Sequence, residues 1–245
     1  MSAWLFDLGN TRLKCAPLLE DGRIGEVIAV PHRIDQVGGG LADVLPGRIE
    51  QAWLASVAAP ELTAAVLREL EGRCRHVSLA RTRADCAGVR IAYAQPDRLG
   101  VDRFLALLAA HARGDGPSLL CGVGTALTVD LLDRDGCHLG GRIAPSPTLM
   151  REVLHARAAQ LPVAGGGYRE FAADTADALA SGCEGAALGL IEHSVAAARQ
   201  RLGTAPALLL HGGGGENLMP HLPTARWVPG LVIEGLAVWA KTECA

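Results

Sequence analysis

The sequence is poor in aromatic residues and has no basic segment. Aromatic residues make up 4% of its 245 positions, and the formal net charge is −3. Proteins that bind nucleic acids usually carry a basic surface, and those that bind single strands add aromatic rings on which bases stack. The composition therefore argues against a nucleic-acid partner.

Long apolar runs and paired cysteines are also missing. No apolar run approaches the ~20 residues that a membrane-spanning helix needs. Asp7 and Asn10 interrupt the apolar amino-terminal segment, so it does not resemble a signal peptide. The seven cysteines are scattered without a Cys-x-x-Cys pair, which is typical of buried, reduced cysteines. We therefore expect a cytoplasmic protein without a membrane segment.

The first 18 residues predict a β-hairpin. Residues 4–6 form an apolar run, Gly9-Asn10 is a dipeptide typical of tight turns, and residues 13–18 continue as the return strand. We expect the rest of the chain to be organised around this hairpin, because its turn carries more polar groups than a turn requires.

The extra polar groups of the hairpin are a carboxylate at Asp7, a hydroxyl at Thr11 and a cation at Lys14. Only two of the 23 basic residues are lysines, so a lysine at this place is informative. Exposed backbone N–H groups, a hydroxyl, a cation and a carboxylate are the components of a site for phosphate and Mg²⁺.

The same pattern returns in the second half of the chain. Residues 118–132 predict a strand, a glycine turn at Gly122–Thr125 and a return strand, directly after the strong break at Gly114–Pro117. We therefore predict two α/β domains, 1–115 and 116–245. Each is expected to hold a mixed sheet that starts with antiparallel strands and is flanked by helices. Two such halves are the arrangement of the actin-like (ribonuclease H-like) ATPase and sugar-kinase fold.

Later segments of the second half add two predictions. Residues from about 176 are expected to form one helix and residues 182–202 another. Gly212–Gly215 forms a third glycine turn after an apolar strand, and its backbone could approach the flat face of an adenosine. A single glycine turn of this kind is more often structural.

Gly100-Val101-Asp102-Arg103 lies in the amino-terminal part of a helix that Pro96-Asp97 is expected to open and that continues to Arg113. A helix start favours an acidic residue because of the helix dipole, which is a purely structural explanation. The same residues would also suit a carboxylate general base beside an arginine that holds an anionic substrate. The residues alone leave both interpretations open. Asp130 is equally a metal ligand or a solvated strand residue, and Thr175 a substrate contact or a helix cap.

The chain resembles the type III pantothenate kinases over nearly its whole length. The resemblance rests on four motifs, none of which is specific alone: Asp7-Leu8-Gly9-Asn10-Thr11; Gly100-Val101-Asp102-Arg103; Gly124 to Asp130 followed by Gly140 to Pro145; and Leu231 to Leu236.

The resemblance implies ATP-dependent phosphorylation of pantothenate, the first step of coenzyme A synthesis. It also implies Mg²⁺, a monovalent cation (K⁺ or NH₄⁺), and a homodimer with active sites near the subunit interface. Asp102 would accept the proton, and Asp7, with Asp130 as a second candidate, would hold metal. The residues implied for ATP are Asp7, Leu8, Gly9, Asn10, Thr11, Arg12, Leu13, Lys14 and Thr125. Those implied for pantothenate are Tyr93, Gly100, Val101, Asp102, Arg103 and Thr175.

Two positions depart from the family pattern. The family usually has an aspartate two residues before the glycine of Gly-Thr-Ala, and that aspartate holds the monovalent cation, whereas this chain has Gly122. The second phosphate motif usually ends in Pro-Gly, whereas this chain has Pro145-Ser146. Two alternatives to the pantothenate kinase activity follow: a regulatory accessory protein on the same fold, or another small-molecule kinase or phosphatase of the actin-like group.

Overall fold

The chain forms two compact units. The computed structural model describes residues 2–31, 41 and 44–244. One unit comprises Met1–Gly114 together with Gly230–Ala245, and the other comprises Asp115–Pro229. The boundary between the halves lies at the glycine-rich break found in the sequence. The terminal helix, however, packs in the first unit, whereas the sequence predicts it in the second domain, 116–245.

The first unit contains a five-stranded mixed sheet. Strand β1 is antiparallel to β2 and parallel to β4, so the order across the sheet is β3-β2-β1-β4-β5. The strands are β1 (Ala3–Leu8), β2 (Arg12–Leu18), β3 (Ile28–Pro31), β4 (Ile49–Ser56) and β5 (Cys74–Leu79). A two-stranded ribbon of β6 (Asp85–Cys86) and β7 (Val89–Arg90) and a 3₁₀ turn, η1 (Pro96–Arg98), follow them.

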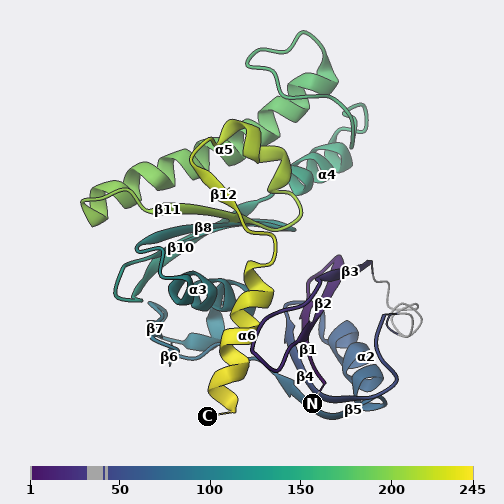
Figure 1. Cartoon of the computed structure of the whole chain (residues 1–245). Coiled ribbons are helices and arrows are strands. Elements are labelled where there is room, and N and C mark those ends of the chain that lie inside the picture. Colours follow the sequence, from purple (N-terminus) through teal and green to yellow (C-terminus); the bar gives the residue numbers. More distant parts are fainter. Residues whose placement is uncertain (1, 32–40, 42–43, 245) are drawn as a thin grey trace. The chain divides into compact units, whose positions relative to one another are not determined.

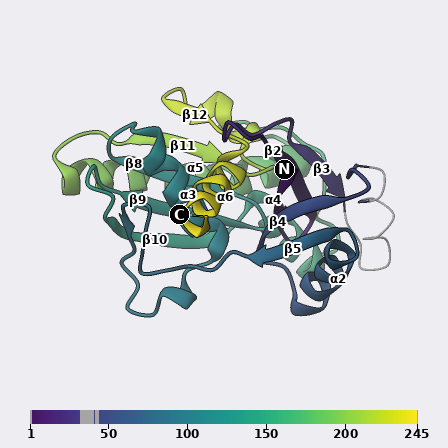
Figure 2. The same ribbon diagram turned by 60° about the horizontal axis from the view of Figure 1, so that its bottom comes forward.

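Helices of the first unit contact the sheet through side chains that alternate along its strands. Phe6 and Leu8 of β1 belong to one core cluster with Leu62 and Val66 of α2 (Pro60–Glu71). Helices α3 (Val101–Arg113) and α6 (Leu231–Glu243) lie side by side, and α6 also contacts β1, β2 and β4 (Figures 1 and 2). Since successive strand residues face opposite sides, Asp7 lies on the face opposite α2.

The second unit repeats the topology of the first. Its sheet has the order β10-β9-β8-β11-β12, again with an antiparallel hairpin at the start and two parallel strands beyond it. The strands are β8 (Ser118–Val123), β9 (Ala126–Leu132), β10 (His138–Pro145), β11 (Ala207–His211) and β12 (Ala225–Trp227). This repetition confirms the predicted actin-like α/β fold.

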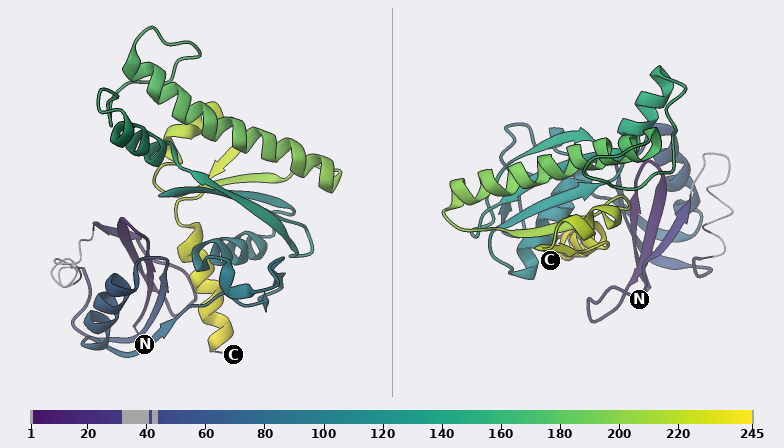
Figure 3. Two further views of the ribbon diagram at one scale, coloured as in Figure 1. Left: turned by 180° about the vertical axis from the view of Figure 1, so that it is seen from behind. Right: turned by 90° about the horizontal axis from the view of Figure 1, so that it is seen from above.

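One long helix covers the second sheet. Helix α5 (Thr175–Leu202) runs along the sheet and contacts β8 and β9, while the shorter α4 (Pro147–Arg157) lies beside α5 (Figure 3). A 3₁₀ segment, η2 (Glu216–His221), joins β11 to β12. The prediction of two separate helices from about 176 to 202 was wrong. Gly182 lies inside α5, where a glycine costs about 1 kcal/mol but removes no hydrogen bond.

Among the described residues, no helix combines the length and the apolarity that crossing a membrane requires.

Candidate active site

The first hairpin has polar, exposed residues at its turn and buried residues in its two strands. The backbone N–H of Gly9 donates to the carbonyl of Arg12 over 3.1 Å, which closes the turn between β1 and β2. Asn10, Thr11 and Arg12 are exposed at the tip. Leu8 and Leu13, which the resemblance assigns to ATP, are buried in the core. These two residues can therefore offer a ligand only backbone groups.

Asp7 occupies an unfavourable place for a charged carboxylate. It is half-buried at the end of β1, and the sheet register places it directly opposite Lys14 of β2. Burial raises the pKa of Asp7 from 3.8 to about 6, the Lys14 ammonium opposes this rise, and the Asp102 carboxylate adds to it. The Lys14 ammonium and the Asp102 carboxylate thus both lie within electrostatic range of Asp7.

Asp102 lies in the first turn of α3, where Gly100 is the capping residue. One carboxylate oxygen, Oδ1, accepts the backbone N–H of Arg103 over 2.8 Å. A Cβ atom added to Gly100 would lie 2.7 Å from this oxygen. A glycine at position 100 therefore leaves the space that the Asp102 carboxylate occupies, which explains the glycine that opens the predicted catalytic motif.

Tyr93 and Arg103 form a second pair near Asp102. An Arg103 guanidinium nitrogen donates to the Tyr93 hydroxyl over 3.3 Å, and the guanidinium carbon lies 5.9 Å from the centre of the Tyr93 ring. Arg103 is buried, with 6% of its surface exposed. A guanidinium has five N–H donors in a fixed planar arrangement, so one held in this way can recognise a carboxylate. Two residues predicted to contact substrate are thus brought together.

The second unit carries the second predicted phosphate turn. The N–H of Gly124 donates to the carbonyl of Ala126 over 2.9 Å, and Thr125 is exposed at the tip between β8 and β9. As in the first turn, a glycine N–H closes the hairpin and a threonine is exposed, although the accepting carbonyl lies two residues on rather than three.

Comparison with known proteins assigns the family. The model of the type III pantothenate kinase family matches residues 4–197. A type III pantothenate kinase of Stenotrophomonas maltophilia (strain K279a) is 60% identical over 245 residues, which cover 100% of both chains. The chain belongs to the type III pantothenate kinase family.

Solved structures agree with the fold. A Campylobacter jejuni protein named for the Baf family of transcriptional activators has a TM-score of 0.63 at 19% identity and covers 98% of both chains. A ROK family glucokinase of Streptomyces griseus, in complex with glucose and AMPPNP, has a TM-score of 0.52 at 10% identity and covers 99% of both chains. At these identities the likeness concerns the fold alone.

Asp130, the second candidate metal ligand, is paired with a histidine inside the protein. It is buried, and its Oδ1 lies 2.9 Å from Nε2 of His138 on the neighbouring strand β10. Within the part of the chain that the structure describes, no group of three or more histidine, cysteine, aspartate or glutamate residues is arranged to hold a metal. The sequence does not reveal the pairing of His138 with Asp130, since a pairing between adjacent strands depends on their register.

The first turns of α5 and α4 show what Thr175 and Ser146 do in the fold. Asp174 caps α5 by accepting the N–H groups of Ala176 and Asp177, so Thr175 is not the cap, and it is exposed in the first turn. Ser146, which replaces the usual glycine of the second motif, caps α4 by accepting the Leu149 N–H over 3.2 Å. The departure at Ser146 therefore has a structural explanation, while Thr175 stays a candidate for substrate contact.

The glycine run after β11 packs against protein atoms. A Cβ on Gly212, whose φ is +86°, would lie 2.5 Å from the Val123 carbonyl oxygen, and one on Gly214 would lie 2.9 Å from the Val123 side chain. A Cβ on Gly215 would meet the Trp227 ring at 2.6 Å. Three of the four glycines thus have packing reasons that do not involve an adenosine.

Proposed function

We propose that this chain transfers the γ-phosphoryl group of ATP to pantothenate and thereby catalyses the first step of coenzyme A synthesis. Membership of the type III pantothenate kinase family supports the reaction. The observation that carries the residue assignment is the place of Asp7, which lies opposite Lys14 in the sheet register and within electrostatic range of the Asp102 carboxylate. It links the predicted phosphate hairpin to the predicted general base within one unit.

The first hairpin binds phosphate oxygens of ATP through the backbone N–H groups of its tip, the Thr11 hydroxyl and the Lys14 ammonium. Thr125, at the turn between β8 and β9, is a further residue that we assign to ATP. Asp7 suits a divalent cation, because a bound cation would compensate for both lost solvation and the nearby Asp102 charge. The Mg²⁺ that accompanies ATP would neutralise part of the phosphate charge there.

Asp102 acts as the general base. As the primary hydroxyl oxygen of pantothenate forms its bond to the γ-phosphorus, the bond from that phosphorus to the bridging oxygen of ADP breaks. The hydroxyl proton moves to the Asp102 carboxylate, and ADP departs with the bridging oxygen. The hydrogen bond from the Arg103 N–H holds one carboxylate oxygen in place.

Arg103 binds the carboxylate of pantothenate. Its side chain is buried and is held by the Tyr93 hydroxyl, so its donors are oriented before substrate arrives. The distance between the carboxylate and the primary hydroxyl of pantothenate would then determine which alcohol is presented to Asp102. Thr175 is a further contact to pantothenate, at the start of α5.

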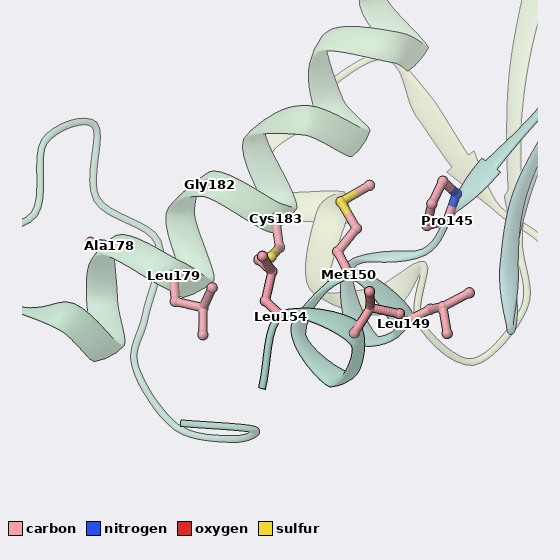
Figure 4. A pocket seen from close by; sticks show the side chains of 9 residues that line it. Pro145, Leu149, Met150, Leu154, Ala178, Leu179, Gly182 and Cys183 are labelled. Carbon is pink, nitrogen blue, oxygen red and sulfur yellow. The ribbon is translucent and has the colours of Figure 1, made fainter. Parts of the chain in front are cut away.

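A homodimer is formed through an apolar surface of the second unit. A pocket of about 440 Å³ lies between α4 and α5, and Figure 4 shows the side chains that line it. At its rim Val153 is 52% exposed and Leu154 is 42% exposed. Exposed apolar side chains that are grouped on neighbouring helices are typical of protein interfaces. A second copy of the chain would cover them, in line with the dimers implied by the family resemblance.

The proposal is tested by direct detection of 4′-phosphopantothenate after incubation of the purified chain with ATP, Mg²⁺ and pantothenate. Replacement of Asp102 by Asn should lower kcat by about 10²–10⁴-fold, the contribution typical of a general base. The Asp97→Asn variant is a matched control, because Asp97 is exposed in η1, five residues earlier in the chain. Full activity of Asp102→Asn would remove Asp102 from the mechanism. Absence of product from the unmodified chain would favour the accessory-protein alternative.

A further inference from the structure

Gly122 stands where the family usually has the aspartate that holds a monovalent cation. It is buried at the end of β8, where it pairs with Thr128 of β9 on one side and with His211 of β11 on the other. Residues that pair across neighbouring strands project toward the same face of a sheet. Cys121 and Val123 belong to the core cluster with α5. Gly122, Thr128 and His211 therefore lie on the face of the sheet opposite α5.

The imidazole of His211 occupies the space that a side chain at position 122 would need. A Cβ atom on residue 122 would lie 2.8 Å from Cε1 and 2.9 Å from Nε2 of His211, and 2.8 Å from the Thr128 hydroxyl oxygen. Real Cβ atoms essentially never approach other atoms within 3.0 Å. An aspartate at position 122 and His211 in its present position therefore exclude one another.

Asp130 is the carboxylate that the described part of β9 places on this face. Asp130 lies two residues beyond Thr128 on β9, and therefore on the same face, but its Oδ1 is engaged by His138 over 2.9 Å. The side chains that lie nearest Gly122 are those of His211 and Thr128, and they offer one neutral oxygen, the Thr128 hydroxyl. K⁺ requires several oxygen ligands, and an imidazole N–H repels rather than coordinates a cation. The donor set at Gly122 does not fit a monovalent cation.

We infer that the pair Gly122 and His211 replaces the monovalent-cation site, so that phosphoryl transfer by this chain is independent of K⁺ and NH₄⁺. In either protonation state the His211 ring carries at least one N–H donor. The ring also lies next to the second phosphate turn, because Gly212 packs on the Val123 backbone and the Gly214 N–H donates to the Val123 carbonyl over 3.0 Å. His211 thus acts as a positioning residue where other family members use an ion. This inference rests on the proposed function.

The first test measures the rate in chloride salts of K⁺, NH₄⁺, Na⁺ and tetramethylammonium at equal ionic strength. Product is quantified directly by chromatography, because coupling enzymes have cation requirements of their own. We expect the same rate in every salt. A rate that appears only with K⁺ or NH₄⁺ would overturn the inference and leave the proposed kinase function standing. No activity in any salt would instead contradict the proposed function.

A second measurement does not need turnover. Thallium(I) is a probe for K⁺ sites, and its NMR line broadens when it exchanges with a bound site. We expect that the unmodified chain does not broaden the thallium line. The double variant Gly122→Asp/His211→Ala should broaden it, because this variant combines a carboxylate with the space to hold it. Broadening by the unmodified chain that K⁺ abolishes would overturn the inference, whether or not the chain is a kinase.

Variants at position 211 separate a positioning role from a structural one. His211→Ala should lose activity in every salt and regain part of it with added imidazole, whereas a merely unfolded variant would not be rescued. The double variant should recover activity only with K⁺ or NH₄⁺. His193→Ala is the matched control, because His193 is exposed on α5 in the same unit. Full activity of His211→Ala in tetramethylammonium would contradict the role assigned to His211.

Discussion

At the scale of single residues, Asp7 combines a high energetic cost with a place in the proposed ATP site. Its pKa is raised to about 6 chiefly because the carboxylate loses solvation in the fold. A carboxyl group whose pKa is higher in the folded state binds its proton more tightly there. Stability is therefore lost as the pH rises from 3.8, the ordinary value, through about 6, and the penalty is complete above that pH.

Replacing Asp7 by Asn should therefore stabilise the nucleotide-free chain while it weakens binding of Mg²⁺ and ATP. Above about pH 6 the gain in unfolding free energy should be about 1–2 kcal/mol, less than the full pKa shift implies because Asp7 is only half-buried. The gain should shrink as the pH falls toward 3.8. Urea unfolding at several pH values measures it. Asp135→Asn, at an exposed turn, is the matched control, and a destabilised Asp7→Asn would contradict the assignment.

The Arg103–Tyr93 pair makes a prediction about substrate affinity. Arg103→Lys keeps the charge but loses the planar set of donors, so the KM for pantothenate should rise roughly 10- to 100-fold, as expected when a charge-assisted hydrogen bond of about 1.5–3 kcal/mol is lost. The KM for ATP should stay unchanged. Arg98→Lys is the control, because Arg98 is exposed in η1. Steady-state kinetics measure both KM values. An equal rise of the KM for pantothenate and for ATP would argue against a contact between Arg103 and pantothenate.

At the scale of secondary-structure elements, the terminal helix is held to the first unit by direct backbone packing. A Cβ on Gly235 of α6 would lie 1.8 Å from the carbonyl oxygen of Leu105 in α3. No side chain fits there, so the two helices approach as closely as their backbones permit. Because this contact lies inside the Leu231–Leu236 motif of the family, at least one residue of that motif has a packing role.

Gly235→Ala should consequently destabilise the chain by about 3 kcal/mol or more, because the helices must separate to admit a methyl group. The matched change Gly189→Ala lies in α5, where an added Cβ meets nothing within 4 Å. It should stabilise the chain by about 0.5–1 kcal/mol, the usual gain when alanine replaces glycine in a helix. Denaturant unfolding of the two variants gives the comparison. A tolerated Gly235→Ala would contradict the close packing of α3 and α6.

At the scale of the whole molecule, the apolar surface of α4 and α5 predicts the oligomeric state. Leu154→Glu places a charge on a side chain that is 42% exposed in the isolated chain but would be buried in a dimer. The variant should be a monomer by analytical ultracentrifugation, because an unpaired charge is costly at a buried interface. Its KM for pantothenate should rise if the sites lie near that interface.

The control for the dimer is Leu19→Glu, which changes a leucine of equal exposure, 41%, in the first unit. This variant should remain dimeric. A Leu154→Glu chain that stays dimeric, or an unmodified chain that is monomeric at all concentrations tested, would show that another surface, or none, joins the subunits.

The sequence by itself determined the repeated strand–turn–strand units, the break between the halves, the Asp102 segment and, through the combined motifs, the family. These features are local, because turn residues and the spacing of apolar positions act over a few neighbours. The same local signals could not decide between one helix and two from residue 176 onward. Nor could they assign the terminal helix to a unit, since that depends on which surface its apolar face meets.

Only the tertiary structure decided which side chains meet across strands and helices. The register placed Lys14 opposite Asp7, His138 beside Asp130, and His211 against Gly122. The sequence shows Gly122 as a departure from the family pattern, but not the histidine that fills the space. That pairing joins β8 to a strand from much later in the chain, so no short-range pattern records it. Strand order and register, which the packing of the whole sheet determines, bring the two together.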